Sequence, residues 1–178
     1  MMLKRALIYG ALIAVAGAIL TFVMGAMGLE SNQQASQFVG LLGFLFPIVG
    51  VVLAIRSAKN ADPGPFSFGD GFKQGLLVAL VAAVLGALFT YLYVTAINPG
   101  YLDSMREAAN AQLRQQGLGP RELQQMESMQ AGMTSPGALT ALGFFTQLIV
   151  GAIISAVAAA IMRRKERPVD DGYGGQTA

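Results

Sequence analysis

The chain contains no cysteine, no histidine and no tryptophan among its 178 residues. Without Cys it has neither disulfides nor thiol chemistry, and without His as well it lacks the usual protein ligands of zinc and haem. Charged residues make up only 12% of the chain, whereas a typical soluble domain carries about 25%. Such a chain cannot expose most of its surface to water, so a soluble globular protein is excluded.

Long uncharged stretches occupy most of the sequence instead. They lie between Arg5 and Glu30, Glu30 and Arg56, Lys73 and Asp103, and Glu127 and Arg163. A helix needs about 20 apolar residues to cross a hydrocarbon core of roughly 30 Å. The sequence therefore predicts an all-α, polytopic membrane protein with four transmembrane helices, at about residues 6–27, 38–55, 75–97 and 136–162.

We expect one four-helix transmembrane domain over residues 1–167 and a disordered, Gly-rich cytoplasmic tail over residues 168–178. The first apolar stretch begins after Lys4 and Arg5, as the hydrophobic region of a signal peptide does. That region is about 7–15 residues long in signal peptides, and the stretch here is longer. A retained helix is favoured, with cleavage as the alternative.

The distribution of Lys and Arg predicts the orientation. One set of flanks contains Lys4, Arg5, Arg56, Lys59, Lys73, Arg163, Arg164, Lys165 and Arg167. The other set contains only Arg106, Arg114 and Arg121, alongside the acidic residues Asp103, Glu107, Glu122 and Glu127. Because cytoplasmic loops are enriched in basic residues, we expect cytoplasmic termini and an external segment at 98–135.

The external segment has the pattern of an amphipathic helical hairpin. Apolar residues recur at helical spacing at Leu102, Met105, Ala109 and Leu113, and again at Leu123, Met126 and Met129. Gly117 is suited to end the first helix and Pro120 to begin the second. We expect the hairpin to cap the bundle or to lie on the membrane surface. Binding of a partner or lipid by its Met-bearing face is the alternative.

Small residues recur at every fourth position within the predicted spans. They are Gly10, Ala14 and Ala18; Gly50 and Ala54; Gly75, Ala79, Ala83 and Ala87; and Gly143, Gly151, Ser155 and Ala159, with Gln147 in the same series between Gly143 and Gly151. Small side chains let helix backbones approach closely in lipid. We predict internal helix packing, above all between the third and fourth spans, with oligomerisation as the alternative.

Gln147 is the most polar side chain deep in a predicted span. An unpaired amide in hydrocarbon costs a few kcal/mol. We therefore expect it to form an interhelical hydrogen bond, either to a Thr or to a carbonyl freed near Pro47, with contact to a substrate as the alternative. The hydroxyls of Thr21, Thr90, Thr146 and Ser155 can bond to their own helix backbone.

The stretch Phe66–Leu77 is the most distinctive local pattern, and Ser67 or Asp70 is suited to cap the helix of the third span. Four spans, a helical external segment, this stretch and the Arg-Arg-Lys sequence after the last span resemble one family. Its members are small four-span bacterial membrane proteins grouped as a domain of unknown function and found chiefly in Bacteroidetes. The resemblance runs from about Leu3 to Lys165. It implies an inner-membrane protein and supplies no activity and no binding residues.

The function predicted from these observations is that of a structural or accessory component of the bacterial inner membrane. We expect it to act by packing with membrane lipid or partner proteins, either a second copy or another membrane protein, and not with nucleic acid. A small transporter, or a homo-oligomeric channel lined by Thr146, Gln147 and Ser155, is the alternative. Ion-coupled carriers usually place ionisable groups in the membrane, and no span contains one.

Enzymatic activity is not expected. Nucleophile–base pairs and metal sites are hard to build without His, Cys or an acidic residue within a span. The chemically capable groups that remain are Asp70, Lys73, Asp103 and Glu107 in the loops. We therefore predict no catalytic, cofactor-binding or metal-binding residues and no cofactor.

Overall fold

The computed structural model describes residues 2–27, 33–61, 64–115 and 119–163, and all regular elements within these ranges are helices. They are α1 (Met2–Ala26), α2 (Gln33–Ala61), α3 (Phe68–Leu92), the π-helical turn η2 (Tyr93–Ile97), α4 (Tyr101–Gln115), α5 (Pro120–Met133) and α6 (Pro136–Met162). Helices α1, α2, α3 with η2, and α6 provide four stretches long and apolar enough to cross a membrane. The prediction of an all-α polytopic membrane fold is confirmed.

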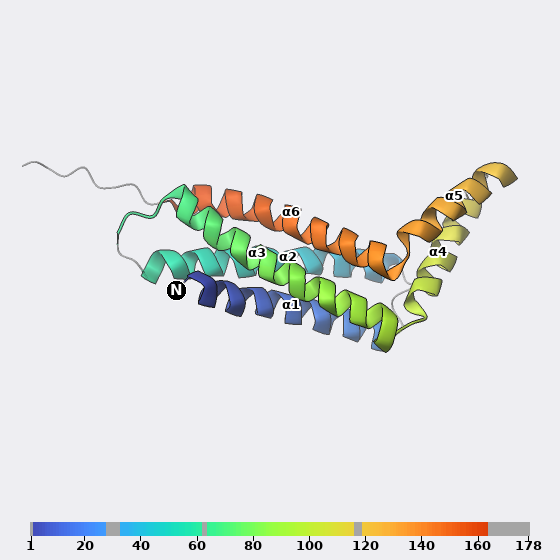
Figure 1. Ribbon diagram of the computed structural model, residues 1–178, viewed down its shortest axis with the longest axis horizontal. Coiled ribbons are helices and arrows are strands. Elements are labelled where there is room, and N and C mark those ends of the chain that lie inside the picture. Colours follow the sequence, from blue (N-terminus) through green and yellow to red (C-terminus); the bar gives the residue numbers. More distant parts are fainter. Residues whose placement is uncertain (1, 28–32, 62–63, 116–118, 164–178) are drawn as a thin grey trace, which may run out of the picture.

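The four long helices lie side by side, and successive helices run in opposite directions (Figure 1). The start of α1 and the end of α6 lie at one end of the bundle, which we call the terminal end. Helices α4 and α5 form a hairpin, the arm, which extends from the opposite end, the arm end (Figure 1). The most extensive contact between helices is that of α3 with α6.

Helices α1, α2 and α3 are longer than the apolar stretches that predict them, whereas α6 coincides with its predicted span at 136–162. Helix α2 covers Gln33–Ala61 where the sequence predicts a span at 38–55, and α3 begins at Phe68 where the span is predicted from residue 75. Apolar length measures the hydrocarbon core, whereas a helix continues into the polar interface until a cap or breaker ends it. The predicted tail at 168–178 lies outside the described residues.

The start of α3 is fixed by the predicted cap. The backbone N–H of Asp70 donates to Oγ of Ser67 at 3.2 Å, and the N–H of Ser67 donates to Oδ2 of Asp70 at 3.2 Å. The hydroxyl of Ser67 also donates to Oδ2 of Asp70 at 2.6 Å. This reciprocal arrangement is a capping box, in which two otherwise unpaired donors of the first turn are satisfied.

Close packing dominates the terminal half of the bundle, where α3 meets α6. A methyl group added at Gly75 would lie 2.5 Å from Oγ of Ser155. One added at Gly71 would lie 3.0 Å from Cβ of Ala159, and one added at Gly151 would collide with Cβ of Ala79. The two backbones therefore approach as closely as small residues allow, which confirms the predicted contact between the third and fourth spans.

Helix α1 is packed into the same half. A methyl group at Gly10 would lie 2.7 Å from Cβ of Val81 on α3, and one at Gly50 of α2 would collide with Ile13 of α1. The buried core formed here is continuous, and it comprises Ala6, Ile13, Val51, Ala54, Ile55, Ala58, Phe66, Val78, Ala82 and Ala158.

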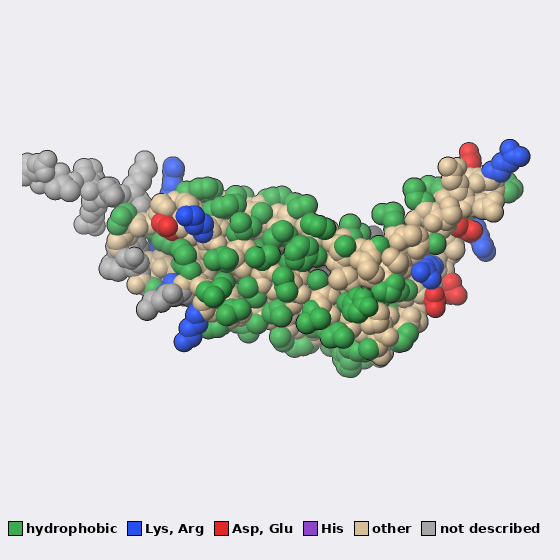
Figure 2. All heavy atoms as spheres, viewed as in Figure 1, with side chains coloured by type: hydrophobic (Ala, Val, Ile, Leu, Met, Phe, Trp, Pro, Cys, Tyr) green, Lys and Arg blue, Asp and Glu red, His purple; other side chains and the backbone are tan. Residues whose placement is uncertain are grey.

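The outer surface of the bundle is apolar, as a lipid-facing surface requires. Large hydrophobic side chains such as Leu12, Leu41, Leu88 and Phe145 are more than half exposed on α1, α2, α3 and α6. The visible face of the bundle is covered with hydrophobic side chains, and basic residues gather at the terminal end (Figure 2). Soluble monomeric proteins rarely expose an apolar surface of this extent.

Candidate functional site

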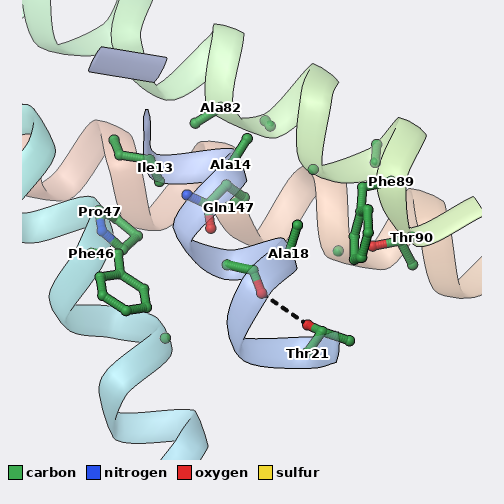
Figure 3. A pocket seen from close by; sticks show the side chains of 16 residues that line it. Ile13, Ala14, Ala18, Thr21, Phe46, Pro47, Ala82, Phe89, Thr90 and Gln147 are labelled. Atoms are coloured by element: carbon green, nitrogen blue, oxygen red, sulfur yellow. Dashed lines mark hydrogen bonds between the residues drawn. The ribbon is translucent and has the colours of Figure 1, made fainter. Parts of the chain in front are cut away.

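The arm half of the bundle contains a half-open cavity of about 260 Å³. All four membrane helices line it, with Thr21 from α1, Phe46 and Pro47 from α2, Phe89 and Thr90 from α3, and Gln147 from α6. Figure 3 shows these side chains around a common space, with that of Gln147 near its centre. Ile13 and Ala82 also line the cavity and belong to the buried core, so they form its floor.

Glycine creates this space. Gly17, Gly43, Gly86 and Gly143 all line the cavity, and a methyl group added at any of them would meet nothing within 4 Å. Five glycines in the other half are instead in tight contact, and they are Gly10, Gly50, Gly71, Gly75 and Gly151. The spacing of small residues in the sequence is the same in both halves. The prediction that the small residues mediate helix packing is therefore right for the terminal half, whereas Gly143 in the arm half faces the cavity and makes no such contact.

A groove of about 440 Å³ continues the cavity between α2, α3 and α6. Gly43, Thr90, Gly143 and Gln147 line both the cavity and the groove. At the groove, Phe44 of α2 is 51% exposed and Leu142 of α6 is 55% exposed. Because these residues belong to the lipid-facing surface, the groove connects the cavity with the hydrocarbon around the bundle.

Polar groups within the cavity and groove are left unpaired. In the described part of the chain, the side chains of Gln147, Thr90 and Thr146 have no hydrogen-bond partner. The hydroxyls of Thr21 and Ser155 do bond to their own helices, at 3.0 Å to the carbonyl of Gly17 and 2.6 Å to that of Gly151. The predicted interhelical hydrogen bond of Gln147 is not seen among the described residues, and it stays a prediction.

Pro47 adds a backbone acceptor to the same region. A proline inside a helix has no N–H, so the carbonyl four residues earlier loses its usual donor. That carbonyl belongs to Gly43, which lines both the cavity and the groove. The site therefore combines a primary amide, two hydroxyls and a carbonyl, and its lining includes no Asp, Glu, Lys or Arg from the described residues.

The residues predicted for an oligomeric channel do not form one surface. Thr146 and Gln147 line the groove, whereas Ser155 is fully buried against α3. The loop groups are also separated. Asp70 and Lys73 lie at the terminal end on α3, whereas Asp103 and Glu107 lie on the arm.

Gln74 is a structural residue that lies just before the third span predicted at 75–97. Its side chain is fully buried, and Nε2 donates to the carbonyl of Met2 at 3.3 Å. Oε1 is buried and has no partner among the described residues. The contact joins the start of α1 to α3. The only signal for it in the sequence is a Gln seven residues after Ser67, the cap of a membrane helix.

The arm is fixed to the bundle at its base. Tyr93, Val94 and Leu102 form a small buried cluster, against which Phe89, Tyr101 and Leu139 pack. The ring of Phe89, which lines the cavity, lies 5.8 Å from that of Tyr93. The base of the arm is thus in direct contact with a wall of the cavity.

Arg106 ties α4 to the end of α5. Its Nε donates to Oγ1 of Thr134 at 3.0 Å, and Nη2 donates to the carbonyl of Thr134 at 3.3 Å. Nη1 pairs with Oδ1 of Asp103 at 3.3 Å. Thr134 is 7% exposed, so these hydrogen bonds form at the protected junction between the arm and α6.

The remainder of the arm extends away from the bundle (Figure 1). The prediction of two helices in this segment is confirmed, but the arm does not cap the bundle. Its two apolar faces meet along a groove of about 240 Å³, lined in part by Leu113, Met126 and Met129. Met129 is 63% exposed and Met133 is 59% exposed.

Replacing Arg106 by Leu is expected to loosen the arm. The change removes two charge-assisted hydrogen bonds to Thr134, each worth about 1.5–3 kcal/mol. Hydrogen exchange of the α5 amides should then accelerate about tenfold or more, because local opening becomes easier. Arg121, which is exposed on α5, provides the control in Arg121→Leu. Equal exchange rates in the two variants would show that Arg106 does not hold the arm.

Searches of curated proteins and of solved structures found no match to this chain. Residues 8–164 match a family described as "Protein of unknown function (DUF4199)". This match spans all four membrane helices and the arm, and it confirms the family resemblance drawn from the sequence. The chain is therefore a member of the DUF4199 family.

Proposed function

We propose that this protein is a lipid-binding accessory component of the bacterial inner membrane, without enzymatic activity. The observation that carries the proposal is the cavity in the arm half, which joins the lipid-facing surface through the groove between α2 and α6. In a membrane, hydrocarbon chains surround that groove. The lining of an empty cavity forfeits dispersion contacts, so a hydrocarbon chain that enters it is stabilised.

Both termini are proposed to lie in the cytoplasm, with the arm outside. Support comes from the basic residues gathered at the terminal end: Lys4, Arg5, Arg56, Lys59, Lys73 and Arg163. Arg164, Lys165 and Arg167 lie outside the described residues. On the arm, basic side chains are balanced by acidic ones, as in the ion pair of Arg114 with Glu127 at 3.9 Å. With this orientation, the cavity belongs to the outer half of the membrane.

The packing of the terminal half argues against a pore through one copy. Gly75 with Ser155 and Gly151 with Ala79 leave no space between α3 and α6 on that side. A pore formed by several copies cannot be lined by Ser155 unless this contact separates. A small transporter of lipid is the second candidate. Pro47 lies inside α2 and the π-helical turn η2 follows α3, and such features often mark hinges.

Lipid retention tests the proposed function. The Gly143→Leu variant places a large side chain in the cavity, where a methyl group would meet nothing within 4 Å. We expect it to retain less lipid than the unmodified protein, as counted by mass spectrometry of intact complexes released from mild detergent. Gly137→Leu is the control, because Gly137 is on the same helix and equally uncrowded but does not line the cavity. Equal retention in both variants would contradict the proposal.

A further inference from the structure

We infer that the cavity selects a neutral lipid whose head group carries carbonyl or hydroxyl oxygens, bound by Gln147 with Thr90, Thr146 and the carbonyl of Gly43. This inference rests on the proposed function and adds the chemical class of the ligand. The proposed function requires only that a hydrocarbon chain enters the cavity, whereas this inference specifies the chemistry of the lipid's head group.

The depth of Gln147 sets the first condition on the ligand. Gln147 lies about 11 residues into α6, or roughly 16 Å of helix from Pro136. The hydrocarbon core is roughly 30 Å thick, so the amide is close to its middle. A lipid that reaches this amide must place its polar group well below the level of the phospholipid head groups.

The polar groups of the site set the second condition. The amide of Gln147 offers two donors and one acceptor, and the hydroxyls of Thr90 and Thr146 offer both. The carbonyl of Gly43 adds an acceptor without its usual helical donor, because Pro47 has no N–H. A hydroxyl on the ligand can donate to this carbonyl or to Oε1 of Gln147, and a ligand carbonyl can accept from Nε2. Pairing removes the cost of leaving these groups unbonded in hydrocarbon.

The absence of charge sets the third condition. The lining described for the cavity and the groove contains no Lys, Arg, Asp or Glu. A phosphate at this depth would lie in hydrocarbon without a counter-charge, at a cost far above that of a neutral polar group. The head group must therefore be uncharged. Its hydrocarbon tail has a path outward past Phe44, Leu142 and Val150, which line the groove.

Two kinds of membrane lipid supply this chemistry. A diacylglycerol carries ester carbonyls and one hydroxyl, and a prenyl quinone or quinol carries two ring oxygens. Both are neutral and both have long hydrocarbon tails, so the same polar groups serve either one. The experiment has to separate them.

The full-length protein is reconstituted into nanodiscs of phosphatidylcholine alone, with added diacylglycerol, or with added prenyl quinone. Binding is measured by mass spectrometry of the intact complexes released from the discs. We expect one of the two neutral lipids to be retained in preference to phosphatidylcholine. Gln147→Leu should weaken its retention about tenfold, which corresponds to about 1.4 kcal/mol, and phosphatidylcholine retention should not change. Thr140→Val is the control, because the Thr140 hydroxyl already donates to the carbonyl of Pro136 at 2.8 Å and does not line the cavity.

Folding of the key variant can be checked independently. Gln147→Leu removes an unpaired amide, so its thermal stability without added neutral lipid should be equal to or higher than that of the unmodified protein. Preference for either neutral lipid, lost in Gln147→Leu, supports the inference and identifies the source. Retention of phosphatidylcholine alone, or neutral-lipid retention that Gln147→Leu does not change, overturns it. In those cases the proposed function stands if Gly143→Leu still lowers total lipid retention, and falls if it does not.

Discussion

Replacing Gly151 by Leu is expected to destabilise the protein strongly, whereas Gly143→Leu, about two turns earlier on the same helix, is tolerated. A single methyl group at Gly151 would already collide with Cβ of Ala79 and lie 3.5 Å from its Cα. A Leu there must separate the backbones of α3 and α6 along their main contact. Inserting atoms into a packed core typically costs about 1–3 kcal/mol, and moving a backbone costs more.

The comparison is internally controlled, because both variants add the same side chain to the same helix. At Gly143 the added atoms enter empty space, and replacing glycine inside a helix also removes a penalty of about 1 kcal/mol. The measurement is the fraction of monodisperse protein remaining after heating in detergent, determined by size-exclusion chromatography. Equal losses in the two variants would mean that the two halves of the bundle are packed alike.

A second large effect is expected from single cysteines placed at the two ends of the bundle. The natural chain has no Cys, so Ser128→Cys on the arm and Asn60→Cys near the end of α2 each introduce one thiol. Both positions are exposed. In spheroplasts, a membrane-impermeant maleimide should label Cys at position 128 fully and Cys at position 60 only after the inner membrane is permeabilised. The physical reason is the excess of Lys and Arg at the terminal end. The reverse labelling pattern would overturn the proposed orientation.

The membrane fold could be predicted because hydrocarbon imposes a simple rule on the sequence. A spanning helix excludes charge over about 20 residues, so residues such as Arg5, Arg56 and Arg163 mark where a span is bounded. The start of α3 could not be predicted in the same way, whereas both ends of α6 match the predicted span. The reciprocal hydrogen bonds of Ser67 and Asp70 start α3 seven residues before the predicted span, and polar residues of the interface fit a helix as well as apolar ones do.

The candidate site could be predicted only in part. Gln147 stands out in the sequence because it is polar within an apolar span. The cavity around Gln147 could not be predicted, because Gly143 and Gly151 belong to the same series of small residues. A methyl group at Gly143 would meet empty space, whereas one at Gly151 would meet Ala79. Packing depends on which residue faces the glycine across the interface, and a single helix does not encode this. The hydrogen bond between Arg106 and Thr134 could not be predicted for a similar reason. The two residues are 28 positions apart, and only the fold brings them together.

The central claim is that lipid chains enter the arm half of the bundle and are excluded from the terminal half. Because the chain has no Trp, each Phe→Trp variant has a single tryptophan whose fluorescence reports on its own surroundings. Phe46 lines the cavity, Phe66 is buried at the terminal end, and Phe145 is 59% exposed on the lipid-facing surface.

The most direct measurement is the quenching of these three variants in nanodiscs whose phospholipids carry bromine along the acyl chains. We expect Phe46→Trp to be quenched to nearly the same extent as Phe145→Trp, and Phe66→Trp to be quenched only weakly. That result would place acyl chains inside the bundle at the cavity. Quenching of Phe46→Trp no stronger than that of Phe66→Trp would show that lipid does not enter, and would contradict the account.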